Sequence, residues 1–386
     1  ADPAIRADAE RLFGDVTQEE VSAFLEEGDF LQDPGGWIAS NARNYVTRKI
    51  DAALDRYLDR TSGAMVTIQG AVQSGRSSAV RRLADQAQAK GLAADIVDFQ
   101  DFMEFHRDGV RWTADKAVKW VLEEIGIDSP KSFNRADFGA EACQALLRGL
   151  EARTNRVRRA FLIFDSFDAL TRSVEEATEG DLLARWLTSL RNTLPTQPPF
   201  DRMTLVVVAN TPQWPMDGVM SSTLSQGRSL TTGRFGDDEV RELFDAHDLH
   251  GDDFSMARGY ALDTLGGHPY LCHLLAAELA FGESLNDVRR VVDQVEGAFD
   301  RHWRNIWSLV CRYYRDRNKP EEPAAHALQQ AVRLADKDGG ESITIAELRM
   351  LKSIGVLNGG DEPTMCGFYR NAIARKIKQF LSPGEA

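Results

Sequence analysis

Residues 65–77, Met-Val-Thr-Ile-Gln-Gly-Ala-Val-Gln-Ser-Gly-Arg-Ser, form the stretch that decides the fold. A short apolar run leads into Gly70-x4-Gly75-Arg76-Ser77, and apolar residues at helical spacing follow at once. This is the strand–loop–helix layout of a phosphate-binding loop, G-x-x-x-x-G-K-[ST], with arginine in the place of lysine. The layout predicts a nucleotide site, and the arginine raises the question of whether the nucleotide is hydrolysed or only held.

Each residue type in this loop has a physical role toward phosphate. Gly70 and Gly75 can adopt backbone angles closed to other residues, so successive N–H groups can face one concavity. The helix that follows adds the positive end of its dipole, and Ser77 would place a hydroxyl on Mg²⁺. Arg76 keeps the positive charge, but a planar guanidinium is not equivalent to a flexible ammonium at a crowded phosphate. The alternative interpretation is a Gly/Ser-rich surface turn between a strand and a helix.

The composition of the chain narrows its class. The 386 residues are 43% apolar and 27% charged, which is ordinary for a globular protein of two or three domains. A net charge of −13 makes a general nucleic-acid binder a poor fit, although a local basic face is compatible with it. No apolar run approaches the length of a membrane span, and no signal peptide is evident. The four cysteines are widely spaced without C-x-x-C, so we expect reduced, mostly buried thiols in a cytoplasmic protein.

Apolar stretches at regular intervals predict the architecture of the core. Continuous apolar strands that alternate with helices are typical of a parallel sheet with helices on both faces. After about residue 236 the pattern becomes helical, and near Val356 a short strand entering a hairpin is expected. The strands are expected at residues 65–68, 93–99, 160–164, 204–209 and 228–232.

Four domains follow from these patterns. Residues 1–40 are expected to form an N-terminal helical segment, and residues 41–236 the P-loop NTPase α/β core. Residues 237–300 are expected to form a helical lid, and residues 301–386 a winged-helix-like domain.

An acidic cluster follows the third expected strand. In P-loop NTPases a carboxylate at the tip of a buried strand holds the water shell of Mg²⁺, and Asp165 stands at that position, with Ser77 as the second magnesium-binding residue. The next position is often a glutamate that activates the attacking water, but here it is Ser166, which is no base near neutral pH. Asp168 is the candidate substitute, and its alternative role is to cap the helix that follows.

Asn210 ends the next apolar strand and is followed by Thr-Pro. In this architecture a polar residue there reaches the γ-phosphate or the attacking water. The same tripeptide is also an ordinary turn signal. Both interpretations stay open, so Asn210 is the weakest member of the candidate catalytic set.

Taken in order, several motifs resemble the STAND-type ATPases, and within them the bacterial AAA-like domain family. The resemblance runs from about residue 45 to about residue 380. The motifs that support it are Q-S-G-R-S-S at residues 73–78, F-D-S-F-D at residues 164–168, L-G-G-H-P-Y-L at residues 265–271 and C-x-x-Y-R at residues 366–370.

This resemblance implies a site and a ligand. It implies ATP or ADP with Mg²⁺, held by a loop that includes Ser74 and Ser78 beside the glycines, Arg76 and Ser77. It also implies that Pro269 packs near the adenine. In the family such modules are often coupled to sensor or effector domains, so a protein partner is expected. A homo-oligomer is compatible with the sequence, and a membrane partner is not expected.

Two departures from the family pattern concern hydrolysis. Arg76 replaces the phosphate-binding lysine, and Ser166 replaces the water-activating glutamate. Losses of this kind cost on the order of 10²–10⁴-fold each in rate. The first hypothesis is therefore a nucleotide-binding regulatory module whose hydrolysis is slow or absent. Whether the chain is an enzyme is left open at this point.

Two other functions compete with this hypothesis. An active Mg²⁺-dependent ATPase would need Arg76 and Asp168 to take over the missing roles. A nucleotide-independent scaffold or DNA-binding adaptor would use the basic face of the terminal helix within the winged-helix-like domain, although the overall acidity argues against DNA. The basic residues of that face are Arg370, Arg375, Lys376 and Lys378.

Overall fold

The computed structural model of the chain describes most, but not all, of its residues. The described residues are 31–32, 36–105, 113–154, 160–167, 169–170, 177–193, 202–209, 228–250, 253–280, 303–304, 306–311, 313–314, 320–336, 343–357 and 365–381.

The chain divides into two compact units. The sheet unit comprises Lys49–Arg234 and Ala298–Ala386, and the helical unit comprises Ala1–Arg48 and Phe235–Gly297. Each unit is described by itself. The four domain boundaries expected from the sequence stay a prediction, and the expected N-terminal helix lies largely outside the described residues.

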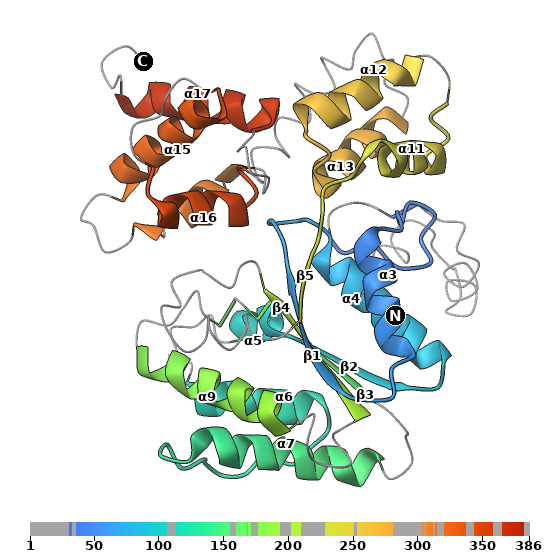
Figure 1. The fold of residues 1–386 in the computed structure, drawn as a ribbon, viewed down its shortest axis with the longest axis vertical. Coiled ribbons are helices and arrows are strands. Elements are labelled where there is room, and N and C mark those ends of the chain that lie inside the picture. The colour runs from blue at the N-terminus through green and yellow to red at the C-terminus, as the bar shows by residue number, and fades with distance from the viewer. Residues whose placement is uncertain are drawn as a thin grey trace, which may run out of the picture. The chain divides into compact units, whose positions relative to one another are not determined.

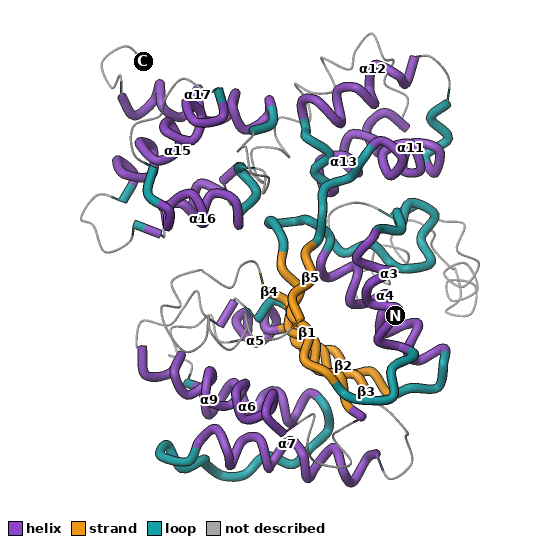
Figure 2. Tube along the Cα trace, in the orientation of Figure 1, coloured by secondary structure: helices purple, strands orange, loops and turns teal. Residues whose placement is uncertain are grey.

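A five-stranded sheet in the order β2-β3-β4-β1-β5 forms the centre of the sheet unit (Figure 2). Every pairing in it is parallel, so the carboxyl ends of the strands lie along one edge. All five strands expected from the apolar runs are confirmed. Their bounds are β1 Ala64–Gln69, β2 Ala93–Asp98, β3 Ala160–Asp165, β4 Met203–Ala209 and β5 Arg228–Thr231.

Helices cover both faces of this sheet (Figure 1), which confirms the predicted α/β class. The reason is visible in β3, whose six residues are all buried. Phe161 and Ile163 join the core on one face, and Leu162 and Phe164 join the core on the other. The first face is covered by α3 (Lys49–Leu58) and α4 (Arg76–Ala89), and the second by α5 (Phe99–Phe105), α6 (Ala114–Glu124), α7 (Phe138–Thr154) and α9 (Ala177–Thr193).

A buried carboxylate ties two of these helices together. Glu179, in the first turn of α9, accepts a hydrogen bond from the backbone N–H of Ala114 at the start of α6, at 2.7 Å. The guanidinium of Arg135 forms an ion pair with the other carboxylate oxygen at 2.7 Å. The N–H groups of a first helical turn have no partner within the helix, so Glu179 satisfies one that would otherwise be buried without an acceptor.

The described C-terminal part of the sheet unit contains the helices α15 (Glu321–Ala335), α16 (Ile345–Ser353) and α17 (Gly367–Leu381). The strand expected near Val356 is wrong in its described part. The N–H groups of Val356 and Leu357 both donate to the carbonyl of Leu351, so this pair closes the end of α16, and Gly355 adopts φ +86°. The rest of the expected hairpin lies outside the described residues, so the winged helix stays a prediction.

The helical unit confirms the helical pattern expected after residue 236. The helices among its described residues are α11 (Asp237–Ala246), α12 (Asp253–Gly259), the π-helical turn η2 (Tyr260–Thr264) and α13 (Pro269–Ala280). Gly267 must be glycine, because a Cβ there would lie 2.1 Å from the carbonyl oxygen of Phe235. That close approach accompanies a hydrogen bond of 2.7 Å from the N–H of Phe235 to the carbonyl of Gly267. The last part of the expected helical lid, residues 281–300, lies outside the described residues.

The helical unit also buries histidines that are electrically neutral. Burial, with smaller effects from His247 and Arg48, lowers the pKa of His273 to about 3. Burial followed by the Arg43 guanidinium lowers the pKa of His247. Desolvation disfavours the charged imidazolium, so both rings stay uncharged near neutral pH.

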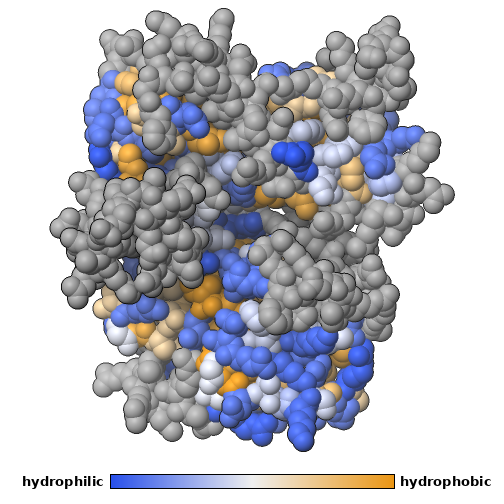
Figure 3. Space-filling view, turned by 180° about the vertical axis from the view of Figure 1, so that it is seen from behind, coloured by the Kyte–Doolittle hydropathy of each residue, from blue (hydrophilic) through white to orange (hydrophobic). Residues whose placement is uncertain are grey.

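The surface and the cysteines agree with the composition. Seen from the side shown in Figure 3, much of the described surface is hydrophilic, with apolar patches between. None of the described helices has the length and hydropathy to cross a membrane. All four cysteines are described; none forms a disulfide, and three are buried, as expected.

Candidate functional site

The loop between β1 and α4 has the backbone of an anion-binding concavity. Gln73 and Gly75 both adopt left-handed angles, with φ of 58° and 78°. Gly75 is the N-cap of α4, and no side chain caps the helix start. The N–H of Ser74 donates to the carbonyl of Ala71 at 3.2 Å, which closes the turn before the helix. Such alternating left-handed residues, followed by a helix N-terminus, are suited to a phosphate group.

The start of the loop is fixed by the end of β5. The N–H of Thr232 donates to the carbonyl of Gln69 at 2.8 Å, and its hydroxyl lies 2.6 Å from the hydroxyl of Ser74. A Cβ on Gly70 would lie 1.8 Å from that Thr232 hydroxyl. Gly70 is therefore required here by the close approach of Thr232, in addition to any role toward phosphate.

Asp165 lies at the carboxyl end of β3, at the same edge of the sheet. Its side chain is almost completely buried, with 1% of the residue exposed. The carboxylate oxygen Oδ1 accepts a hydrogen bond from the N–H of Ser166 at 2.8 Å, whereas Oδ2 is buried and accepts no hydrogen bond from the described residues. Ser166 adopts a left-handed φ of 52°, so the chain turns at this residue. After the turn, the N–H of Phe167 donates a hydrogen bond to the carbonyl of Val208 on β4.

The electrostatics of Asp165 connect it to the loop. Burial raises the pKa of this carboxyl, and the neighbouring carboxylate of Asp98 raises it further. The Ser77 hydroxyl, the Ser166 N–H and the Arg76 guanidinium act in the opposite direction. The loop and the tip of β3 thus lie close enough for the loop residues to lower the pKa of Asp165.

The donor set at this edge fits a hard divalent cation. Mg²⁺ takes oxygen ligands, usually one or two carboxylates with water and phosphate oxygens. The unsatisfied oxygen Oδ2 of Asp165 and the hydroxyl of Ser77 are donors of that kind. A buried carboxylate oxygen without a partner is costly, and a cation there would remove the cost.

The turn after α16 contacts the loop from the C-terminal part of the sheet unit. A Cβ built on Gly355 would lie 2.5 Å from the Cβ of Ala71, so the backbone of the turn is pressed against the loop. The guanidinium of Arg234, just after β5, donates to the carbonyl of Gly355 at 2.9 Å. Ala71 of the loop and the turn that follows α16 are therefore in direct contact.

The structure brings most of the predicted site residues together. All of the predicted loop residues, together with Asp165, lie at one edge of the sheet. Asp168 and Asn210 are outside the described residues. Pro269 is the buried first residue of α13 in the helical unit. The loop residues are Gly70, Ser74, Gly75, Arg76, Ser77 and Ser78.

Three residues around the loop and the strand ends were absent from the predicted set. Thr232 follows β5, and its role depends on β5 lying beside β1, which no local pattern reveals. Arg234 follows β5, and its guanidinium donates a hydrogen bond to the carbonyl of Gly355, which lies far along the chain. Asp98 ends β2 as Asp165 ends β3, and this shared position at two strand ends is the one signal that was readable from the sequence.

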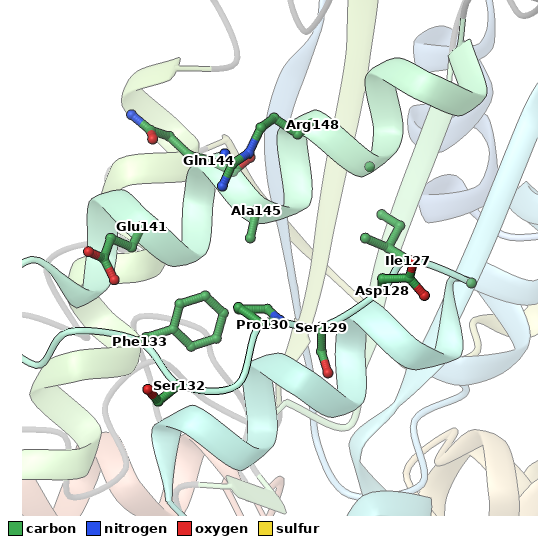
Figure 4. A pocket seen from close by; sticks show the side chains of 12 residues that line it. Ile127, Asp128, Ser129, Pro130, Ser132, Phe133, Glu141, Gln144, Ala145 and Arg148 are labelled. Carbon is green, nitrogen blue, oxygen red and sulfur yellow. The ribbon is translucent and has the colours of Figure 1, made fainter.

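A separate hollow of about 730 Å³ lies between α7 and the segment that follows α6 (Figure 4). Phe133 lies on the side of that segment, and Glu141, Gln144 and Arg148 lie along α7. Glu141 already accepts a hydrogen bond from the N–H of Asn134 at 2.8 Å. None of the residues that line this hollow belongs to the loop or to the strand ends.

The fold of this chain is similar to the folds of several solved structures. No protein-family model matches the chain, and no curated protein matches it. The structure of the Aeropyrum pernix ORC2 protein in its ADP form is similar at 14% identity and a TM-score of 0.48, over 86% of this chain and 97% of that one. Aeropyrum pernix ORC1 in complex with DNA is similar at 14% identity and a TM-score of 0.41, over 86% and 93%.

A replication initiator, DnaA bound to AMPPCP and single-stranded DNA, is similar at 13% identity and a TM-score of 0.33, over 88% of this chain and 93% of that one. At such identities the functional conclusion has to come from the residues of the site itself.

Proposed function

We propose that this chain is a nucleotide-binding regulatory module of the STAND or AAA-like type, which takes ATP or ADP with Mg²⁺ and hydrolyses it weakly or not at all. The observation that carries the proposal is the pairing of two features at one edge of the sheet. The first is the left-handed, uncapped loop at the start of α4. The second is the buried carboxylate of Asp165, whose oxygen Oδ2 has no hydrogen-bond partner among the described residues.

The roles of the residues follow from their chemistry. The backbone of the loop and the N-terminus of α4 would bind phosphate oxygens. Arg76 would add a positive charge, and Ser77 with Asp165 would hold Mg²⁺. When bound, Mg²⁺ neutralises phosphate charge and orients the phosphates.

Weak hydrolysis is proposed because the described residue after the metal-binding carboxylate is Ser166. Its backbone N–H holds Oδ1 of Asp165, and its hydroxyl is no base near neutral pH. Loss of a positioned base lowers rates by about 10²–10⁴-fold. The competing function, an active ATPase, would require another residue to take this role.

Regulation is proposed because the loop contacts the turn after α16. A ligand that changes the position of Ala71 would also act on Gly355, since the backbone of Gly355 lies so close to the methyl group of Ala71 that a Cβ would not fit between them. Such a contact can shift a population between two arrangements only if the ligand binds them unequally. A protein effector that recognises one arrangement is the partner that fits this function.

The proposal is tested by calorimetric titration of the full chain with ADP and with ATP, each with Mg²⁺. Binding is expected for the wild type and is expected to be lost in Gly75→Asp, which places a carboxylate in the phosphate concavity. Gly91→Asp is the matched control, because Gly91 follows the other end of α4, is also left-handed with φ +72°, and has open space around it. Absence of binding in the folded wild type would overturn the proposal.

Hydrolysis is tested separately by phosphate release. We expect the wild type and Asp165→Ala to release phosphate at the same low rate. A wild-type rate of the order of 1 s⁻¹ or more, typical of working enzymes, together with its loss in Asp165→Ala, would favour the active ATPase instead.

A further inference from the structure

Two carboxylates end neighbouring strands in register. Asp98, the last residue of β2, is the Cα partner of Asp165, the last residue of β3. In-register residues of adjacent parallel strands point to the same face, and the strands are about 4.8 Å apart. The side chain of Asp98 is 21% exposed, whereas Asp165 is 1% exposed. An inner and an outer carboxylate therefore stand side by side at the edge of the sheet that holds the phosphate loop.

The inner carboxylate lacks a partner on one oxygen. Oδ1 of Asp165 is engaged by the Ser166 N–H, and Oδ2 is buried without a hydrogen-bond partner among the described residues. A buried carboxylate oxygen without a partner is costly, and a cation bound beside Oδ2 would supply the missing partner.

The outer carboxylate is held loosely. Oδ1 of Asp98 accepts a hydrogen bond from the N–H of Gln100 at 2.9 Å. Its other oxygen lies 3.6 Å from the guanidinium of Arg81 on α4, which is an ion pair but too long for a hydrogen bond. This oxygen can turn toward another cation at little cost, and Arg81 competes with that cation.

We propose that Asp98 is the second acidic group of a divalent-cation site that it shares with Asp165 and the Ser77 hydroxyl, and that this site binds the cation without nucleotide. Magnesium keeps several of its waters, so Asp98 acts through the water shell as a positioning residue for the ion. Two carboxylates supply two negative charges, which match the charge of the ion before any phosphate arrives. The inference deepens the proposed function, because the cation would be in place to receive the phosphates.

Manganese alone is the probe. The full chain, free of nucleotide, is titrated with Mn²⁺ and the free ion is followed by electron paramagnetic resonance. One bound Mn²⁺ that Mg²⁺ displaces is expected in the wild type. Loss of a carboxylate that acts through the water shell lowers metal affinity by about 10–100-fold, which is the expected effect of Asp98→Asn. Asp165→Asn is expected to abolish binding.

Two further variants separate a metal role from a structural one. Arg81→Gln removes the competing charge and is expected to strengthen Mn²⁺ binding, a gain that damage to the fold cannot produce. Asp95→Asn is the matched control, because residue 95 lies on the same strand at an odd spacing from residue 98 and so faces the other side of the sheet. It is expected to leave the affinity unchanged.

The inference is overturned if the wild type binds no Mn²⁺, or if Asp98→Asn binds Mn²⁺ as the wild type does. It is also overturned if Asp95→Asn weakens binding as much as Asp98→Asn. Failure of the proposed function is distinguishable from these outcomes. Nucleotide binding without Mn²⁺ binding refutes only the cation site, and Mn²⁺ binding without nucleotide binding refutes only the nucleotide function.

Discussion

The hydroxyl oxygens of Ser74 and Thr232 lie 2.6 Å apart and join the phosphate loop to the end of β5 across 158 positions of sequence. Thr232 is also bound through its N–H and its hydroxyl to the carbonyl of Gln69, at 2.8 and 3.3 Å. One threonine thus holds both the last residue of β1 and the middle of the loop. The conformation of the loop depends on a neighbour strand as well as on its own glycines.

Thr232→Val keeps the shape of the side chain and removes the hydroxyl. We expect the free energy of unfolding to fall by about 1 kcal/mol, the usual net value of a buried hydrogen bond, and nucleotide affinity to fall with it. Chemical denaturation and calorimetry measure the two effects. Thr231→Val, at the exposed last residue of β5, is the control. Equal effects in the two variants would show that the Ser74 contact is not what matters.

Glu179→Ala leaves the buried N–H of Ala114 without its acceptor. We expect a loss on the order of 2 kcal/mol in the free energy of unfolding, since an unsatisfied buried donor costs its full desolvation. Arg135→Ala removes only the other partner of Glu179. Because the side chain of Arg135 is 64% exposed, this variant is expected to cost less than about 1 kcal/mol. Urea unfolding checks both. A larger loss for Arg135→Ala would place the stabilisation in the ion pair.

The buried His273 predicts a pH dependence of stability. Its pKa is about 3 in the fold, against 6.5 as the reference for an exposed histidine. Above pH 6.5 the imidazole of His273 is neutral in both the folded and the unfolded chain, so its protonation does not reduce the free energy of unfolding. Below that pH His273 binds a proton in the unfolded chain but stays neutral in the folded chain, because burial lowers its pKa there. Stability is therefore lost as the pH falls from about 6.5 toward 3, by up to about 1.4 kcal/mol per pH unit.

Denaturation followed by circular dichroism at pH 7.5 and pH 5.5 measures this loss. His273→Leu is expected to reduce the difference between the two pH values, although His247 contributes with the same sign. The control is His250→Leu, at a side chain that is 63% exposed. If His273→Leu and the wild type lose the same stability on acidification, the buried imidazole is not the cause.

Gly355→Ala would separate the turn after α16 from the phosphate loop. A Cβ at this position has no room beside Ala71, and φ +86° is unfavourable for alanine. We expect faster amide hydrogen exchange at residues 71–74. Gly91→Ala carries a similar backbone strain with open space around it, so it is expected to lower stability without this local effect. Faster exchange in both variants would attribute the change to general destabilisation.

The sheet was predictable because its central strands are buried on both faces. Strands such as β3 and β4 then contain continuous apolar runs, here residues 160–164 and 205–209. The loop was predictable because its glycine spacing is itself the signal. The contacts of Thr232 and Gly355 were not, because each depends on a partner far along the chain.

The error at Val356 has a local cause. Two β-branched or apolar residues before a glycine pair resemble a strand that enters a hairpin. In the structure they are the apolar residues that pack after the left-handed glycine at the end of α16, and both are buried. A helix end with glycine at C′ and a short strand place the same residue types in nearly the same order.

The position of β2 has a consequence for the solubility of the chain. Among the described strands β2 pairs only with β3, so its outer backbone groups face away from the sheet. An unpaired apolar edge invites strands from other molecules, and charges on such an edge prevent this. The strand reads Ala-Ala-Asp-Ile-Val-Asp, in which Asp95 and Asp98 are the only charges. Asp98 would then disfavour aggregation through this edge strand as well as bind a cation. Replacing Asp95 and Asp98 together by neutral residues would be expected to increase aggregation.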